Sequence, residues 1–111
     1  MGLSGLQLRC FDSPDGTLDP DAMAEHVHSD ADPHWAPTRL VALENTHNHC
    51  GGLVYPLEGI QAVRRFCDRH GLLLHLDGAR IWNAHVATGV PLAAIAAPCD
   101  TVSVCLSKGL G

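Results

Sequence analysis

The sequence predicts an α/β fold built on a parallel sheet, and two observations carry this prediction. Apolar runs that suit strands alternate with segments of helical periodicity. The run Leu72 to Leu76 is nearly all apolar, which suits a parallel strand covered on both faces better than an alternating surface strand. Helices between such strands make the strands parallel, with right-handed crossovers. A chain of 111 residues is long enough for one domain.

The first predicted elements are short. Asp19-Pro20 is typical of a helix start, so we expect a helix over residues 20 to 28. Residues 29 to 38 carry two prolines and are expected to form a loop. Leu40 to Leu43 is a short apolar run before Glu44, and this pattern indicates a buried strand.

The second half of the chain has a clearer pattern. Pro56 suits the first turn of a helix that extends to about His70, and Gly71 ends it. After the strand at Leu72, we expect helices from about 79 to 88 and 91 to 97, and a last strand over 101 to 106. In the helix from Pro56 to about His70, apolar residues recur at three-residue spacing: Leu57, Ile60, Val63 and Phe66.

Composition excludes several classes of protein. The net charge is −5, with seven Lys plus Arg in no patch, so nucleic acid and anionic membranes are not expected partners. No apolar run approaches the ~20 residues that span a bilayer. The cysteines are odd in number and lack C-x-x-C spacing, which favours reduced thiols and a cytoplasmic location. They are Cys10, Cys50, Cys67, Cys99 and Cys105.

Three polar segments follow the predicted strands, and each contains residues that carry chemistry. They are Glu44 to Asn48, Asp77 to Arg80, and Ser107-Lys108, which includes the only lysine of the chain. Because ligands of parallel sheets gather beyond the carboxyl ends of the strands, we expect the three segments to meet at one crevice. An acid, an arginine and a lysine are what pyridoxal phosphate requires. The lysine amine forms a Schiff base with the cofactor, while a carboxylate keeps the ring nitrogen protonated.

Other interpretations of these residues remain open. Asp77-Gly78 could be a helix cap and turn, with Arg80 a solvated first-turn residue, and Lys108 a surface charge. If Asp77 is a buried carboxylate at a strand end, it needs a charged partner, and a protonated pyridine ring would serve. The segment His47 to Cys50, with His26 and His28, contains zinc-ligand types. No second cluster completes a four-ligand set, so we predict no metal site.

Several further residues are expected to have structural roles only. His75 is expected to be a satisfied core histidine, and Trp35 and Trp82 are expected to pack. Arg64, Arg65 and Arg69 are expected on the solvated face of their helix. Gly51-Gly52 is expected to form a flexible turn.

Three motifs resemble a known family. They are ENTHN followed by Gly51-Gly52, then HLDGAR, and finally SKGLG, in this order along residues 12 to 111. Together they resemble the low-specificity threonine aldolases, in the group that also holds the aromatic amino acid β-eliminating lyases. The resemblance implies part of the three-layer α/β/α large domain of a fold-type-I enzyme that depends on pyridoxal 5'-phosphate. It also implies cleavage of L-threonine and other β-hydroxy-α-amino acids to glycine and an aldehyde. The alternatives are β-elimination on the same scaffold, or an inactive fragment.

The resemblance also implies roles for single residues. Lys108 matches the Schiff-base lysine, Asp77 the partner of the pyridine nitrogen, and Arg80 the basic residue near the phenolic oxygen of the cofactor. Asn45, Thr46, His47 and Asn48 belong to a strand-end loop beside the cofactor, and the sequence does not choose among the four. Asn48 is a candidate cofactor contact, and His47 is a candidate base for the β-hydroxyl group.

The family also predicts what surrounds the chain. Relatives have a longer N-terminal part of the large domain and, after the lysine, a C-terminal domain. We therefore expect residues 1 to 111 to be the central part of the cofactor-binding large domain, with an open sheet edge and an uncovered sheet face. The complete protein is expected to be a homodimer or homotetramer, and the segment by itself to be poorly folded and inactive.

Overall fold

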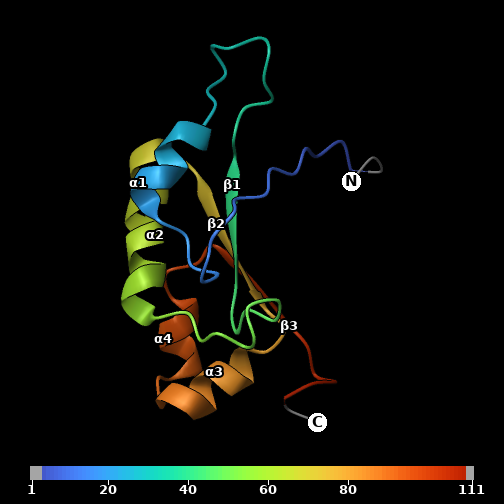
Figure 1. The fold of residues 1–111 in the computed structure, drawn as a ribbon, viewed down its shortest axis with the longest axis vertical. Coiled ribbons are helices and arrows are strands. Elements are labelled where there is room, and N and C mark those ends of the chain that lie inside the picture. The colour runs from blue at the N-terminus through green and yellow to red at the C-terminus, as the bar shows by residue number, and fades with distance from the viewer. Residues whose placement is uncertain (1–3, 110–111) are drawn as a thin grey trace.

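The computed structural model describes residues 4–109 as a three-stranded parallel sheet with helices packed against one face (Figure 1). The strand order is β1-β2-β3, and both strand pairs are parallel. This confirms the predicted α/β class. In chain order the elements are α1 (Pro20–Met23), a 3₁₀ turn (Ala24–His26), β1 (Leu40–Glu44), α2 (Leu57–His70), β2 (Leu73–Gly78), α3 (Ile81–Thr88), α4 (Leu92–Ala96) and β3 (Thr101–Val104).

The hydrophobic core lies between the helices and one face of the sheet. Phe66 on α2 and Leu74 on β2 are fully buried there. The opposite face carries no covering layer among residues 4–109, and Leu40 and Leu73 on it are 47% and 54% exposed. The prediction that the Leu72 to Leu76 strand is covered on both faces is therefore wrong for the described chain. The prediction of a buried first strand is wrong as well. Both strands alternate between residues that face the core and residues that face the uncovered side. Within residues 4–109 this face of the sheet is uncovered.

Most element boundaries follow the local signals in the sequence. The Asp19 side chain accepts a hydrogen bond from the N–H of Asp21 and so begins α1, but the α-helix ends at Met23, earlier than predicted. Gly71 ends α2 in the left-handed conformation, with φ of 65°. β2 continues two residues past Leu76, so Asp77 and Gly78 belong to the strand.

The sequence predicts Arg64, Arg65 and Arg69 all on the solvated face of α2. Arg65 and Arg69 are exposed, but Arg64 is partly buried, so the prediction is wrong for Arg64. Its guanidinium contacts the Asp68 and Asp100 carboxylates, each at 2.7 Å, and donates to the Leu72 carbonyl at 3.1 Å. The helix faces the start of β3 here, so a long side chain can bridge two elements. The N–H of Leu74 and the Arg64 guanidinium both donate to Asp100, and they hold the pKa of that carboxyl below its ordinary value.

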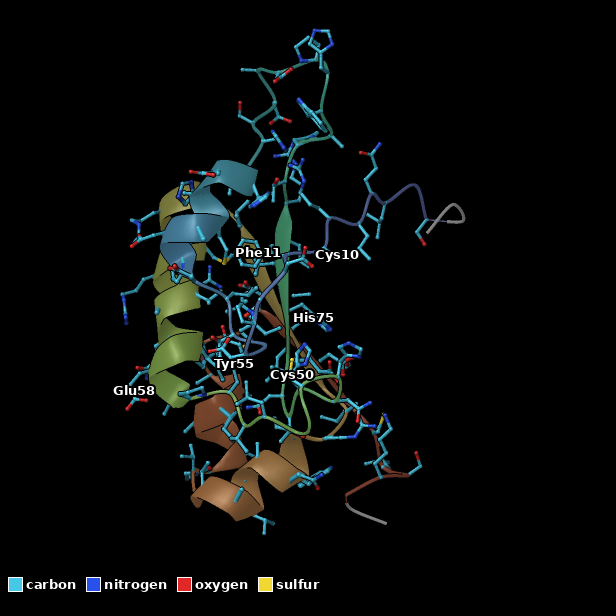
Figure 2. All side chains as sticks on the ribbon, in the orientation of Figure 1. Cys10, Phe11, Cys50, Tyr55, Glu58 and His75 are labelled. Carbon is cyan, nitrogen blue, oxygen red and sulfur yellow. The ribbon has the colours of Figure 1, made fainter. Side chains whose placement is uncertain are left out.

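Tyr55 connects the N-terminal segment to the residues that lead into α2. Its hydroxyl oxygen accepts the N–H of Leu18 at 2.7 Å, and its own N–H donates to the Asn45 side chain at 3.1 Å. The residue is buried, and burial raises the pKa of its hydroxyl above the ordinary 10.0. Figure 2 shows Tyr55 between the helical layer and the sheet.

The two tryptophans differ in environment. Trp82 packs against the core, as predicted. Trp35 is 52% exposed and stacks on His28, with ring centroids 4.9 Å apart, so its expected role in packing is wrong. All five cysteines are free thiols, and burial raises the pKa of Cys67 and Cys99. No helix within residues 4–109 has the length and apolar character needed to cross a membrane.

Candidate functional site

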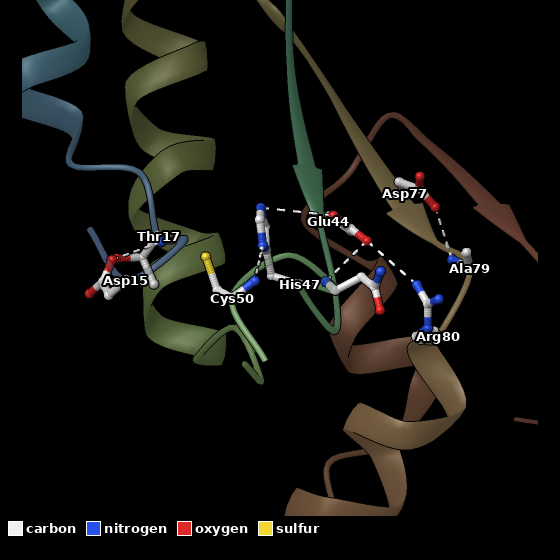
Figure 3. A network of polar contacts seen from close by, with 9 residues as sticks. Asp15, Thr17, Glu44, His47, Cys50, Asp77, Ala79 and Arg80 are labelled. Carbon is white, nitrogen blue, oxygen red and sulfur yellow. Dashed lines mark hydrogen bonds and ion pairs between the residues drawn. The ribbon is translucent and has the colours of Figure 1, made fainter. Parts of the chain in front are cut away.

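The carboxyl ends of β1 and β2 bring two of the predicted polar segments together (Figure 3). Glu44 and Asp77 are register partners in the parallel pair, so their side chains project from the same face of the sheet. One residue further, the N–H of Asn45 donates to the Asp77 carbonyl at 3.0 Å. The alignment confirms that the segments after these two strands share one edge, as the topology predicts.

The loop after β1 folds back on itself as a tight hairpin. The N–H of His47 donates to the Leu53 carbonyl at 2.8 Å, and the N–H of Gly52 donates to the His47 carbonyl at 2.9 Å. Gly51 and Gly52 have φ of 71° and 82°, a region that glycine enters without steric cost. The glycine pair therefore forms the predicted turn, and the turn sets where His47 lies.

Glu44 is the centre of the polar contacts at this edge. Its Oε1 accepts the N–H of Asn48 at 3.2 Å and lies 3.7 Å from Nη1 of Arg80. Its Oε2 lies 3.8 Å from Nε2 of His47. The three side chains Glu44, His47 and Arg80 are between 26% and 30% exposed, so they remain open to a ligand.

Both ring nitrogens of His47 have neighbours in this arrangement. The N–H of Cys50 donates to Nδ1 at 3.3 Å, and Nε2 faces the Glu44 carboxylate. The neutral ring therefore carries its proton on Nε2. To accept a proton from a substrate, His47 would have to do so at Nδ1, after the Cys50 contact opens.

Asp77 is exposed, not buried as predicted, because its side chain lies on the sheet face that the described residues leave uncovered. Its Oδ1 accepts the N–H of Ala79 at 3.0 Å, so the turn interpretation of Asp77-Gly78 applies. Arg80 occupies the N-cap position of α3, and its side chain is only 28% exposed. The turn therefore aims Arg80 back toward Glu44, and within the described part of the chain the second oxygen of the Asp77 carboxylate has no hydrogen-bond partner.

Gly78 explains how closely β2 and β3 approach below this turn. A Cβ at this position would lie 2.8 Å from the Ser103 carbonyl oxygen and 3.2 Å from Cβ of Ile81. Contacts below 3.0 Å do not occur for real side chains without a shift of backbone. The glycine of the HLDGAR motif is therefore required by packing between two strands and a helix.

Lys108 follows β3 and is exposed. The next residue, Gly109, passes so close to α3 that a Cβ there would lie 2.5 Å from Oδ1 of Asn83. The chain after β3 thus turns back over the start of α3, which begins beside Arg80. Among residues 4–109 no hydrogen bond or ion pair joins Lys108 to Asp77 or Arg80, so the third segment lies at the same end of the sheet without a direct contact to the other two.

The sequence predicts His75 to be a core histidine, and this prediction is wrong. The residue lies on the uncovered sheet face with Asp77. Its Nδ1 is 2.7 Å from the Thr101 hydroxyl on β3, and the two residues are register partners. Its polar atom is therefore satisfied across the strands.

The cavities of the described chain lie away from this edge. A small one is bounded by Asn45, Tyr55 and Ile95, and a larger groove lies at Arg39 and Arg69, near the opposite end of the strands. Of the polar strand-end residues only Asn45 lines the small cavity, and Glu44, His47, Asp77 and Arg80 line neither, so these four side chains lie on an open surface within residues 4–109. The same residues contain no group of three or more His, Cys, Asp or Glu side chains that could hold a metal ion.

The sequence places Glu44 and Asn45 in the first polar segment without giving either a role, and it gives Tyr55 no role at all. Asn45 is 1% exposed, and its Nδ2 has no partner among the described residues. Glu44 and Asn45 stand in the ENTHN motif, but nothing in a linear motif shows which of its members point into the site. The alternation of β1 could have placed Glu44 on the same face as Asp77.

The fold gives the class of protein. The parallel α/β arrangement is that of the large domain of fold-type-I enzymes, as in solved threonine aldolases. The family described as Beta-eliminating lyase matches residues 1–111. The chain belongs to this family.

Known proteins similar to the chain agree with this assignment. Over 82% of the length of this chain, it is 48% identical to the low specificity L-threonine aldolase of Saccharomyces cerevisiae. Over 87% of the length of this chain, it is 48% identical to the low specificity L-threonine aldolase of Escherichia coli K12. A solved threonine aldolase from Leishmania major superposes with a TM-score of 0.81 at 28% identity over 93% of the chain. The chain spans only 23%, 28% and 30% of these three proteins, respectively.

The residues at this edge fit the family's cofactor. The exposed Asp77 carboxylate can pair with a protonated ring nitrogen, and the Arg80 guanidinium, 3.7 Å from Glu44, is a cation at the same sheet edge. The close approach of Gly109 to α3 keeps the segment with Lys108 at the same end of the sheet. The chain therefore contains an acid, a cation and an amine that can be directed at one ring.

Proposed function

We propose that the protein with this sequence is a pyridoxal-phosphate-dependent aldehyde-lyase. It cleaves L-threonine and other β-hydroxy-α-amino acids to glycine and an aldehyde. The observation that carries the proposal is the grouping of Glu44, Asp77 and Arg80 at the strand ends, with the Lys108 segment following the neighbouring strand. The names of the relatives support the substrate class.

In this proposal each residue has one task. Lys108 holds the cofactor through its amine, Asp77 keeps a proton on the ring nitrogen, and Arg80 faces the phenolic oxygen. Asn48 lies on the hairpin beside the ring. When bound, the cofactor accepts the electron pair of the breaking Cα–Cβ bond. A carboxylate at Asp77 suits its task because an anion beside the ring nitrogen favours the protonated form.

The reaction also needs a group that takes the proton of the substrate's β-hydroxyl. As the Cα–Cβ bond breaks, its electron pair stays with Cα, the hydroxyl loses its proton, and the Cβ part leaves as an aldehyde. Cα then takes up a proton, so that the other product is glycine. His47 is the candidate for this step, through Nδ1 once the Cys50 N–H is released. Its task depends on where the hairpin holds the ring.

The test is the product of the reaction with L-threonine. Aldolase activity yields glycine and acetaldehyde, whereas β-elimination on the same scaffold yields a 2-oxo acid and ammonia. We expect acetaldehyde and glycine in equal amounts from the full-length protein, and none from Lys108→Ala. Ammonia with a 2-oxo acid would establish the eliminating lyase instead, and no product with bound cofactor would favour an inactive relative.

The wider organisation follows from the same proposal. Residues 1–111 form the central part of the cofactor-binding domain, and the uncovered sheet face is covered by other parts of the protein. The complete enzyme acts as a homodimer or homotetramer on a small amino acid in the cytoplasm. Size-exclusion chromatography with light scattering on the full-length protein tests the oligomeric state.

A further inference from the structure

The Glu44 carboxylate contacts three residues of the candidate site at once (Figure 3). It accepts the N–H of Asn48 at 3.2 Å, and it lies 3.7 Å from the Arg80 guanidinium and 3.8 Å from Nε2 of His47. These partners come from two elements, the hairpin after β1 and the start of α3. No role has so far been assigned to Glu44.

We infer that Glu44 is a positioning residue, which orients the Arg80 guanidinium and the His47 hairpin toward the cofactor. The inference rests on the proposed function, because that proposal places Arg80 and His47 beside the cofactor. Glu44 itself need not touch the cofactor or the substrate. Its effect passes through the two side chains that it holds.

Location makes Glu44 suited to this task. It is the last residue of β1, so its backbone is fixed by the parallel pairing with Asp77. Arg80 begins α3, and its backbone is fixed by the Asp77 turn and the helix. A carboxylate on a rigid strand can therefore hold a long, flexible side chain from another element in one direction.

The exposure of the contacts argues for orientation rather than stability. Glu44 and Arg80 are 30% and 28% exposed, and their charged atoms are 3.7 Å apart. Exposed ion pairs of this kind contribute little to the stability of a fold. A ligand site gains in another way, because an arginine that is already oriented loses less rotamer freedom when the ligand binds.

The experiment is a double-mutant cycle on the full-length protein, with the dissociation constant of pyridoxal 5'-phosphate measured by absorbance titration. The variants are Glu44→Gln, Arg80→Gln and the pair together, with Glu58→Gln as the matched control. Glu58 is an exposed residue in the first turn of α2, distant from the site (Figure 2). Gln keeps the size of Glu and removes its charge.

We expect Glu44→Gln to weaken cofactor binding about fivefold, the cost of ordering one long side chain. In the Arg80→Gln background the same change should alter binding by less than about twofold, because the long side chain that Glu44 orients is gone and only its contacts to the hairpin remain. Glu58→Gln should bind as the wild type does. An equal effect of Glu44→Gln in both backgrounds, or tighter binding, would overturn the inference.

A second measurement requires no cofactor. Amide hydrogen exchange at Asn48 should stay slow in Glu44→Gln, whose amide oxygen still accepts the N–H, and should become at least tenfold faster in Glu44→Ala. Equal protection in the two variants would contradict a role of the side chain in holding the hairpin.

The cleavage of threonine by the wild type separates this inference from the proposed function. If the wild type binds the cofactor and cleaves threonine while the cycle shows no coupling, the inference about Glu44 fails alone. If the wild type binds no cofactor, the proposed function fails and the inference falls with it.

Discussion

Replacing Gly78 by alanine tests the packing beneath the candidate site. The added Cβ would lie 2.8 Å from the Ser103 carbonyl oxygen, well short of the 3.4 Å at which ordinary contacts begin. The oxygen belongs to the backbone of β3 and the second neighbour, Ile81, to the start of α3, so neither can rotate away. The strands must separate by roughly half an ångström, and overpacking of this kind costs about 1–3 kcal/mol.

Urea denaturation of the full-length Gly78→Ala variant should therefore show an unfolding free energy about 2 kcal/mol below that of the wild type. Gly71→Ala is the control, because it has a positive φ of 65° but free space around its Cβ position. It should cost about 1 kcal/mol from backbone strain and leave cofactor binding unchanged. Stability of Gly78→Ala within about 0.5 kcal/mol of the wild type would refute the steric reasoning, since surface substitutions vary by that much.

Three further outcomes follow from the described contacts. Tyr55→Phe removes the acceptor of the Leu18 N–H, and should lower the unfolding free energy by about 1–2 kcal/mol in chemical denaturation. Phe66→Ala, at a fully buried position, should lower it by about 3–5 kcal/mol in the same assay. The pKa of Asp100 is below its ordinary 3.8, so its stabilising contribution is present above that pH and is lost as the pH falls through the lowered value. Asp100→Asn should flatten the decline in thermal stability below about pH 4, and an unchanged decline would contradict this cause.

The fold could be predicted from the sequence because its signals are local. Gly71 and the apolar spacing of α2 fixed the longest helix, and the acids and glycines after the strands marked their ends. The burial of individual strand residues could not be predicted in this way. His75 and Asp77 lie in an apolar strand, but the face to which they point depends on which layers cover the sheet. The contacts of Glu44 could not be predicted for a similar reason, since its partners are brought to it by the parallel register.

The central claim is that Lys108 binds pyridoxal 5'-phosphate at the strand-end site. The most direct measurement is mass spectrometric peptide mapping of the full-length protein after loading with the cofactor and reduction with borohydride. We expect the reduced cofactor to be attached to the peptide containing Lys108, and to be absent from Lys108→Arg. Attachment at another lysine in a well-folded protein, or no attachment at all, would contradict it.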